Sequence, residues 1–280
     1  MTRELDYFAV RMLLLVTMGV CGTCAMAQQD KGVKVSKKVG VVAHRGFYKY
    51  EGSAENTISA MQIAVDHDFA GTEFDMQLTG DGVAIVLHDN MLQGLPIWEA
   101  PYSEVMEHPA ATLSNGERIP TLKEFLENYT NALAQQSARG VSTRLFFEIK
   151  VHSDGGKVAS AATAAVEAVK QWGLEKNVCF ISFSLPICKT IIGLMPTASV
   201  AYLGGDVPPD ELKSMGSNSI DYNYKVLQEH PEWVLQARKL GMSVSVWTVN
   251  DEDTARQMKE LGVDFITTDL PLDVTEWLEN

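Results

Sequence analysis

The chain alternates short β-branched or aromatic runs with amphipathic, helix-like segments, and this alternation limits its fold more than any other feature. Three helical segments reach a glycine just before the next run, at Gly173, Gly241 and Gly262, where a left-handed cap turns a helix back toward a strand. Such units favour parallel strands joined by right-handed crossovers. The candidate strands are residues 39–44, 72–77, 145–150, 178–183, 199–203, 219–223, 243–249 and 265–268. Eight of them predict an α/β fold, a closed (β/α)8 TIM barrel.

The spacing of these strands predicts one long insertion after the second strand, over residues 76–120. Its first part reads as two extended arms around a Gly80-Asp81-Gly82 turn, which is typical of a hairpin. Its second part, residues 89–120, has little periodicity. A long loop at the carboxyl end of a barrel strand is where a wall over a substrate belongs. We therefore expect a single catalytic barrel domain over residues 39–280 that carries this insertion.

Residues 1–27 have the pattern of a signal peptide. An apolar run over 12–24 is followed by Ala25-Met26-Ala27, a small-x-small cleavage pattern. The run is shorter than the roughly 20 residues that a membrane span needs. We expect export to the periplasm or the medium, with no membrane span after cleavage. The polar, lysine-rich residues 28–38 are expected to form a flexible segment.

The four cysteines predict no disulfide framework. Cleavage of the leader would remove Cys21 and Cys24, and lipid attachment at either is the less favoured alternative because the preceding residues make a poor lipobox. Cys179 would open a strand and Cys188 the next helix. The strand between them should hold them too far apart for a bridge, so both are expected to be buried apolar residues.

Charge limits the partners of the chain. It carries 23 Lys and Arg against 36 Asp and Glu, a formal net charge of −13. This charge repels phosphate backbones, which excludes nucleic acid as a partner. A small anionic substrate would need a local cationic site or a bound metal.

Acidic residues gather at the ends of two strands that are neighbours in barrel order. Glu73 and Asp75 lie two apart and face the same way, as do Glu148 and Lys150 on the next strand. Three converging carboxylates have their pKa values raised or share a cation. The all-oxygen set favours Mg²⁺ or Ca²⁺ over zinc. Either pair alone is common at a solvated strand end.

Two histidines also lie at the ends of predicted strands. His44 ends the first strand and is followed by Arg45, while His88 ends the far arm of the hairpin, which can fold it back beside the carboxylates. Two imidazoles with Arg45 and Lys150 supply an acid, a base and a clamp for a tetrahedral anion. We interpret the other histidines as structural: His67, His108, His152 and His230.

The ordered set of motifs resembles the glycerophosphodiester phosphodiesterase family across residues 39–278. The motifs are His44-Arg45-Gly46, Glu55-Asn56-Thr57, Glu73-x-Asp75, Thr79-x-Asp81-Gly82, His88-Asp89, Glu148-x-Lys150, Ser182-Phe183, Trp247-Thr248-Val249-Asn250 and Thr268-Asp269-x-Pro271. The chain departs from the family pattern at Ala54, where a proline is usual, and in the individual loop over residues 89–120, which we expect to set the alcohol preference.

The resemblance implies a (β/α)8 fold and metal-dependent hydrolysis of a small glycerophosphodiester to glycerol 3-phosphate and an alcohol. It makes His44 and His88 the acid/base pair, Glu73, Asp75 and Glu148 the ligands of a divalent metal, Ca²⁺ or Mg²⁺, and Arg45 and Lys150 the phosphate contacts. It also implies that Trp247 lines the side of the site that binds the glycerol moiety.

The remaining motif residues are not assigned to catalysis or to metal binding. Ser182 is expected to face the mouth of the pocket. Asn250, Asp251 and Asp253 are expected to cap the following helix, and Asp269 is interpreted as structural.

Two alternative functions stay open. The same barrel could act as a lysophospholipase-D-like or cyclising phosphodiesterase, which a cyclic phosphate product would reveal. It could also be a binding protein for phosphorylated polyols, although binding alone does not need both histidines. The alcohol, the metal and the oligomeric state are open as well.

Overall fold

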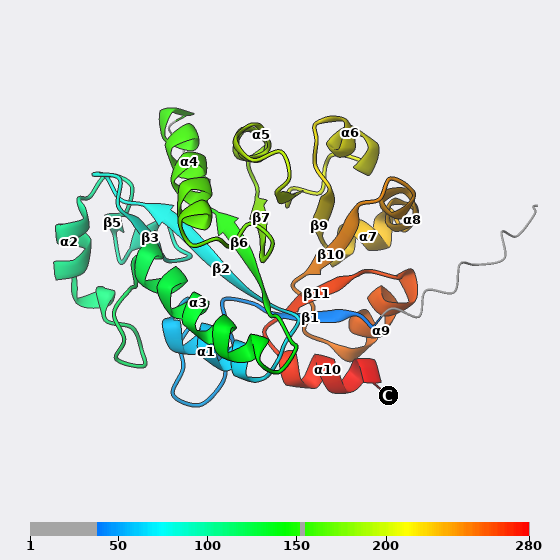
Figure 1. The fold of residues 1–280 in the computed structure, drawn as a ribbon, viewed down its shortest axis with the longest axis horizontal. Helices are drawn as coiled ribbons and strands as arrows, with labels where there is room; N and C mark the ends of the chain where they lie inside the picture. The colour runs from blue at the N-terminus through cyan, green and yellow to red at the C-terminus, as the bar shows by residue number, and fades with distance from the viewer. Residues whose placement is uncertain (1–37, 152–154, 280) are drawn as a thin grey trace, which may run out of the picture. The chain divides into compact units, whose positions relative to one another are not determined.

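The structure, a computed structural model, describes residues 38–151 and 155–279. Eight parallel strands form a ring in the order β1-β11-β10-β9-β8-β7-β6-β2, which a pairing of β1 with β2 closes (Figure 1). The strands are β1 (Gly40–Ala43), β2 (Gly71–Leu78), β6 (Arg144–Ile149), β7 (Val178–Ser182), β8 (Ser199–Tyr202), β9 (Ser219–Asn223), β10 (Ser243–Trp247) and β11 (Phe265–Thr268). The predicted (β/α)8 barrel is confirmed.

Helices follow the barrel strands and surround them (Figure 1). They are α1 (Ile58–Asp66), α3 (Leu122–Ser137), α4 (Gly155–Gln171), α5 (Leu185–Leu194), α6 (Pro209–Ser214), α7 (Tyr224–Glu229), α8 (Glu232–Lys239), α9 (Glu252–Leu261) and α10 (Pro271–Glu279). Gly173, Gly241 and Gly262 all have positive φ, as predicted. At Gly262, φ is 89° and the backbone N–H donates to carbonyl groups of the last turn of α9. This left-handed cap ends the helix and returns the chain to the sheet.

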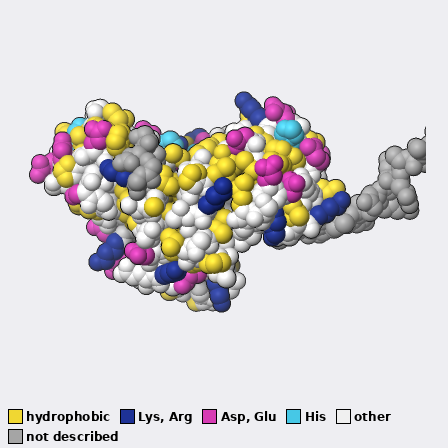
Figure 2. All heavy atoms as spheres, turned by 90° about the horizontal axis from the view of Figure 1, so that it is seen from above, with side chains coloured by type: hydrophobic (Ala, Val, Ile, Leu, Met, Phe, Trp, Pro, Cys, Tyr) yellow, Lys and Arg dark blue, Asp and Glu magenta, His cyan; other side chains and the backbone are white. Residues whose placement is uncertain are grey.

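The surface reflects the acidic composition. Figure 2 shows Asp and Glu side chains on both sides of the face it presents, while Lys and Arg side chains are scattered singly. None of the helices in the described parts of the chain is long and apolar enough to cross a bilayer. The predicted leader and most of the predicted flexible segment, together with Cys21, Cys24 and His152, lie outside the described residues. Export therefore stays a prediction.

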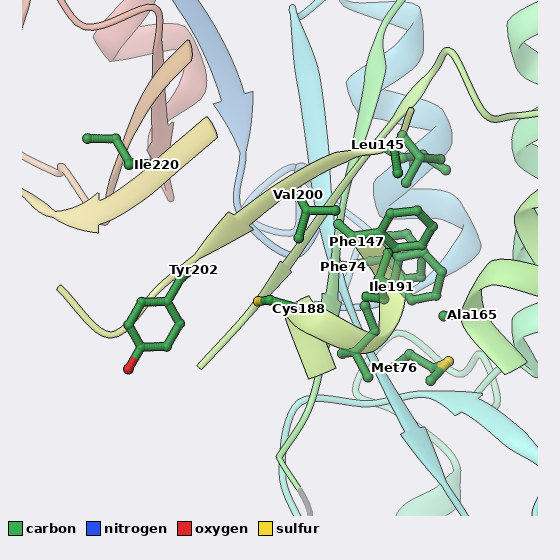
Figure 3. Packing of buried hydrophobic residues seen from close by; sticks show 14 of the residues in the cluster. Phe74, Met76, Leu145, Phe147, Ala165, Cys188, Ile191, Val200, Tyr202 and Ile220 are labelled. Atoms are coloured by element: carbon green, nitrogen blue, oxygen red, sulfur yellow. The ribbon is translucent and has the colours of Figure 1, made fainter. Parts of the chain in front are cut away.

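The main apolar core lies between the barrel and its helices. Phe74 of β2 and Phe147 of β6 are fully buried and stack with ring centroids 4.5 Å apart. Phe125 of α3 stacks on Phe74 at 4.4 Å, and Figure 3 shows Ile191 of α5 beside the same rings. Burial of each ring contributes about 1.5–3 kcal/mol, so these contacts fix the helices on the barrel.

The insertion after β2 begins as the predicted hairpin. β3 (Ala84–Val86) pairs antiparallel with β2, and Gly82 takes a positive φ in the turn. The later part holds more structure than its periodicity predicted. It contains β4 (Met91–Leu92), β5 (Leu95–Pro96), α2 (Tyr102–Glu107) and a short 3-10 helix (Pro109–Ala111). A separate apolar cluster that includes Ile85, Ile97, Val105 and Ile119 stabilises these short elements.

The two cysteines of the barrel are free and buried, as predicted. Burial raises the pKa of Cys179 to about 11 and that of Cys188 to about 12. Because the thiolate is the reactive form, both side chains are unreactive packing residues near neutral pH.

Candidate active site

A cavity of about 170 Å³ opens at the carboxyl ends of the barrel strands. Its lining residues are His44, Arg45, Glu73, His88, Glu148, Lys150, Ile181, Phe183, Leu203, Asp221, Trp247, Thr248 and Thr267. The structure thus brings together most of the residues that the sequence singled out, although they come from distant parts of the chain. The closed ring of strands causes this, because every strand ends at the same mouth.

An acidic triad lies at one side of this cavity. Asp75 of β2 pairs in register with Glu148 of β6, and Glu73 lies two residues before Asp75. All three are buried, and one carboxylate oxygen from each lies within 4.8 Å of the others. Glu73 Oε1 and Asp75 Oδ1 have no hydrogen-bond partner among the described residues. The triad therefore gathers buried oxygen atoms at one point, and two of them have no hydrogen-bond partner among the described residues.

The electrostatics of the triad favour a bound cation. Burial, together with the charges of Asp75 and Glu148, raises the pKa of Glu73 well above its usual range. Burial and Asp75 also raise the pKa of Glu148 to about 7. Lys150 Nζ lies 2.9 Å from Glu148 Oε1 and 3.3 Å from Asp75 Oδ1. Arg45 Nε also lies 3.9 Å from Asp75 Oδ2. These two cations do not offset three carboxylates, and an all-oxygen set of this kind fits a hard divalent cation such as Mg²⁺ or Ca²⁺.

The loop after β1 fixes two of the carboxylates. Asn56 donates to Asp75 Oδ2 at 2.8 Å and accepts from the Asp75 backbone at 3.0 Å. The Arg45 backbone N–H donates to Glu73 Oε2 at 2.8 Å, while its guanidinium contacts Glu55. Arg45 and Asn56 have φ values of 53° and 60°, a left-handed conformation that is costly for residues other than glycine. The hydrogen bonds to Glu73 and Asp75 stabilise this strained loop, and the loop in turn fixes the orientation of the two carboxylates.

Burial alone would raise the pKa of Asp75, but its neighbours reverse that effect. Lys150, His88 and the Asn56 amide all favour the charged carboxylate, and its pKa is lowered. The three members of the triad therefore differ in protonation, with Asp75 the most readily ionised.

His44 is held by the carboxylate of Asp269, for which the sequence analysis expected no contact with the site. Its Nδ1 lies 2.6 Å from Asp269 Oδ1, and its Nε2 lies 3.9 Å from Glu73 Oε2. Asn250 donates to Asp269 Oδ2 at 2.7 Å. With Nδ1–H donated to Asp269, the lone pair of Nε2 faces the cavity.

The interpretation of Asn250 as a helix cap was wrong, and Asp269, which was interpreted as structural, contacts a cavity residue. Asp251 caps α9 by accepting from the backbone of Thr254, which leaves Asn250 to orient Asp269. Burial raises the pKa of Asp269, but hydrogen bonds from His44 and Asn250 outweigh it and lower the value to about 2. Asp269 is therefore a charged partner for the His44 ring.

His88 reaches the cavity from the end of the hairpin. The Gln77 side-chain amide donates to the carbonyl groups of Leu87, His88 and Asp89, which fixes this segment against β2. His88 Nδ1 lies 2.8 Å from Asp89 Oδ1. The second imidazole thus has a carboxylate partner too, but an exposed one.

The wall away from the triad is largely apolar. Phe183 and Trp247 meet edge to face with ring centroids 5.5 Å apart, next to Ile181 and Leu203. Trp247 lines the cavity, and its contact with the glycerol moiety stays a prediction. Asp221 also lies in this wall and was not predicted.

Ser182 does not line the cavity. Its side chain is fully buried and its hydroxyl donates to the Ile149 carbonyl at 2.8 Å. Successive side chains of a strand point to opposite faces. Since Ile181 and Phe183 face the cavity, Ser182 between them must face away.

Comparisons with known proteins agree with this geometry. The model of the glycerophosphoryl diester phosphodiesterase family matches residues 44–273. A glycerophosphodiester phosphodiesterase of Caldanaerobacter subterraneus subsp. tengcongensis is 27% identical over 247 residues, which cover 84% of this chain and 95% of that relative. The crystal structure of a glycerophosphodiester phosphodiesterase from Parabacteroides distasonis superposes with a TM-score of 0.81 at 41% identity and covers 87% of this chain and 98% of that one. The chain belongs to the glycerophosphoryl diester phosphodiesterase family.

Proposed function

We propose that this protein hydrolyses small glycerophosphodiesters to glycerol 3-phosphate and an alcohol. One observation carries the proposal: two imidazoles, two fixed cations and a buried acidic triad surround one cavity in a chain of this family. A simple binding site for an anion would not need buried carboxylates beside it, because they repel the ligand.

The charged groups bind the phosphoryl centre. Glu73, Asp75 and Glu148 would hold the divalent cation, Ca²⁺ or Mg²⁺, which would draw charge from the phosphoryl oxygens when bound. Arg45 and Lys150 contact the remaining oxygens and offset the charge that builds up as the phosphorus is attacked. Trp247 packs against the carbon skeleton of the substrate.

The two histidines move the protons. Asp269 stabilises the imidazolium that forms when His44 Nε2 accepts a proton, so His44 suits the role of general base. His88 then donates a proton to the departing alkoxide. His44 takes its proton from the nucleophile, which is either water or the neighbouring glycerol hydroxyl. Attack by the hydroxyl forms a cyclic phosphate first.

A coupled assay for released glycerol 3-phosphate tests the proposal. Glycerophosphocholine, glycerophosphoethanolamine and glycerophosphoinositol are each supplied with Ca²⁺ or Mg²⁺, and lysophosphatidylcholine is supplied in a parallel assay for released choline. Release of glycerol 3-phosphate supports the proposal. A cyclic phosphate as the end product, or turnover of lysophosphatidylcholine alone, would assign one of the alternative phosphodiesterases, and tight binding without turnover would make the chain a binding protein.

We expect Asp269→Asn to lower kcat about 10–100-fold with little change in KM. An amide can donate to His44 Nδ1, which would put the ring proton on Nε2 and remove the base. Asp269→Glu, which keeps the carboxylate, should restore part of the rate. Asp273→Asn, the same change at an exposed position of α10, is the control. Equal losses in the Asn and Glu variants, or a lowered thermal midpoint that accounts for the loss, would contradict a positioning role.

We expect the metal-free protein to lose stability as the pH rises from 4.5 to 7. Glu148 has a folded-state pKa of about 7 against 4.5 in the unfolded chain, so the folded state binds its proton more tightly in this window. The contribution is complete below pH 4.5 and is lost as the pH rises through 7. A loss of about 2 kcal/mol would lower the thermal midpoint by roughly 4–8 °C.

Thermal unfolding in chelator at pH 5 and pH 7.5 measures this slope. Glu148→Gln should reduce it, whereas Glu127→Gln on the exposed side of α3 should keep it. A midpoint that does not fall between these pH values, or a slope unchanged in Glu148→Gln, would show that Glu148 is not the titrating group.

A further inference from the structure

Asp221 has no part in the reaction proposed above, yet it lies in the same cavity. It sits on β9 and its side chain is almost fully buried, at 1% exposure. Its Oδ1 atom is buried without a hydrogen-bond partner among the described residues. A buried polar atom without a partner is unfavourable, so this carboxyl group should acquire a partner when a ligand fills the cavity.

The position of β9 in the ring shows which part of a bound ligand Asp221 would contact. In the closed order of strands, β9 lies four strands from β2 by either route, so Asp221 faces the cavity from the side opposite Glu73 and Asp75. Its neighbours in the lining are apolar: Leu203 follows β8, and Trp247 ends β10. A phosphodiester held at the triad therefore extends its carbon skeleton across an apolar wall that contains one carboxyl group.

We propose that Asp221 hydrogen-bonds a hydroxyl group of the glycerol moiety and is a specificity-determining residue. This inference rests on the proposed function and names the feature of the substrate that the cavity selects. The partner must be a hydrogen-bond donor or acceptor small enough to reach a buried atom, and a free hydroxyl meets both requirements. A site built to bond a hydroxyl group discriminates strongly against an analogue that lacks it.

The headgroup of a choline ester is a poorer partner for this carboxyl group. A quaternary ammonium carries no N–H group and cannot satisfy Oδ1 by a hydrogen bond, although the Phe183 and Trp247 rings could attract its charge. The indole N–H of Trp247 donates to the backbone carbonyl of Asp221 at 3.0 Å, and therefore not to the carboxyl group. The carboxyl group stays available to the substrate.

Binding of two phosphate monoesters with divalent cation present tests this role. sn-Glycerol 3-phosphate and n-propyl phosphate share a three-carbon skeleton, but only the first has free hydroxyl groups. We expect wild type to bind glycerol 3-phosphate about 10–100-fold more tightly, and Asp221→Leu to lose this preference while its affinity for propyl phosphate changes by less than about threefold. Asp221→Asn keeps hydrogen-bonding groups of the same size and should retain most of the preference.

Leu203→Val is the matched control, because it changes the same wall without removing a polar group. It should weaken the binding of both ligands equally and leave the ratio of their affinities unchanged. An unchanged ratio in Asp221→Leu would overturn the proposal, and so would a wild-type ratio near one. Should Asp221→Leu fail to fold, a crystal structure of wild type with glycerol 3-phosphate decides the matter: a hydroxyl within about 3.2 Å of the Asp221 carboxyl group supports the role, and hydroxyls directed elsewhere reject it.

Release of glycerol 3-phosphate from glycerophosphocholine by wild type is measured in parallel. Turnover with a ligand ratio near one would reject the role of Asp221 and keep the proposed function. A clear preference that depends on Asp221, without turnover, would keep its role and reject hydrolysis.

Discussion

His44→Ala and His88→Ala should each lower kcat by about 10²–10⁴-fold and leave the barrel folded. Both rings line the cavity rather than the core between strands and helices, so their removal opens no large void. Each loss removes one of the two proton transfers, while the charged groups that bind the phosphoryl centre stay in place. We therefore expect KM to change far less than kcat.

His230→Ala is the control for this pair of variants. His230 stacks on Trp233 with ring centroids 4.3 Å apart, on the segment between α7 and α8 and outside the cavity lining. Its variant should keep full kcat. The measurements are steady-state rates on glycerophosphocholine and thermal midpoints of all three variants. Near-normal turnover in either cavity variant would remove that histidine from the mechanism.

The barrel could be predicted because its signals are local. Each strand is a short β-branched or aromatic run, and glycines such as Gly173 and Gly262 mark the return of a helix to the sheet. The second part of the insertion could not be predicted in this way. Its strands β4 and β5 have two residues each, too few to show a period, and contacts between Ile85, Ile97 and Ile119 that are distant in sequence stabilise it.

The site residues likewise divide into those that local sequence signals reveal and those that depend on contacts between distant segments. Glu73, Asp75 and Glu148 could be found because residues two apart share a face and adjacent parallel strands end together. The contact of Asp269 with His44 was missed because it depends on closure of the ring. There Ala43 pairs with Thr268, which sets the next residues, His44 and Asp269, side by side. Asp221 was missed because a single acidic residue inside a strand carries no motif.

Chelation should abolish turnover, and added Ca²⁺ or Mg²⁺ should restore it. The physical reason is the buried triad, since Glu73 Oε1 and Asp75 Oδ1 have no hydrogen-bond partner among the described residues. Without a cation, burial and the Asp75 carboxylate favour the protonated form of Glu148, and the ionised carboxylates of the triad repel a phosphodiester. Rates in excess chelator, followed by titration with each metal, measure the effect, and full activity in chelator would refute the metal assignment.

Direct binding separates loss of metal from loss of catalysis. Calorimetric titration of Ca²⁺ and Mg²⁺ should give an affinity at least about 10-fold lower in Asp75→Asn and Glu148→Gln than in wild type, because each variant removes a charged oxygen ligand. Glu127→Gln, which makes the same change on the exposed side of α3, should bind metal like wild type. If Asp75→Asn and Glu148→Gln bound both metals normally yet lost turnover, the triad would act on the substrate through charge alone. A parallel fall in metal affinity and rate would instead assign the cation to a site that includes Asp75 and Glu148.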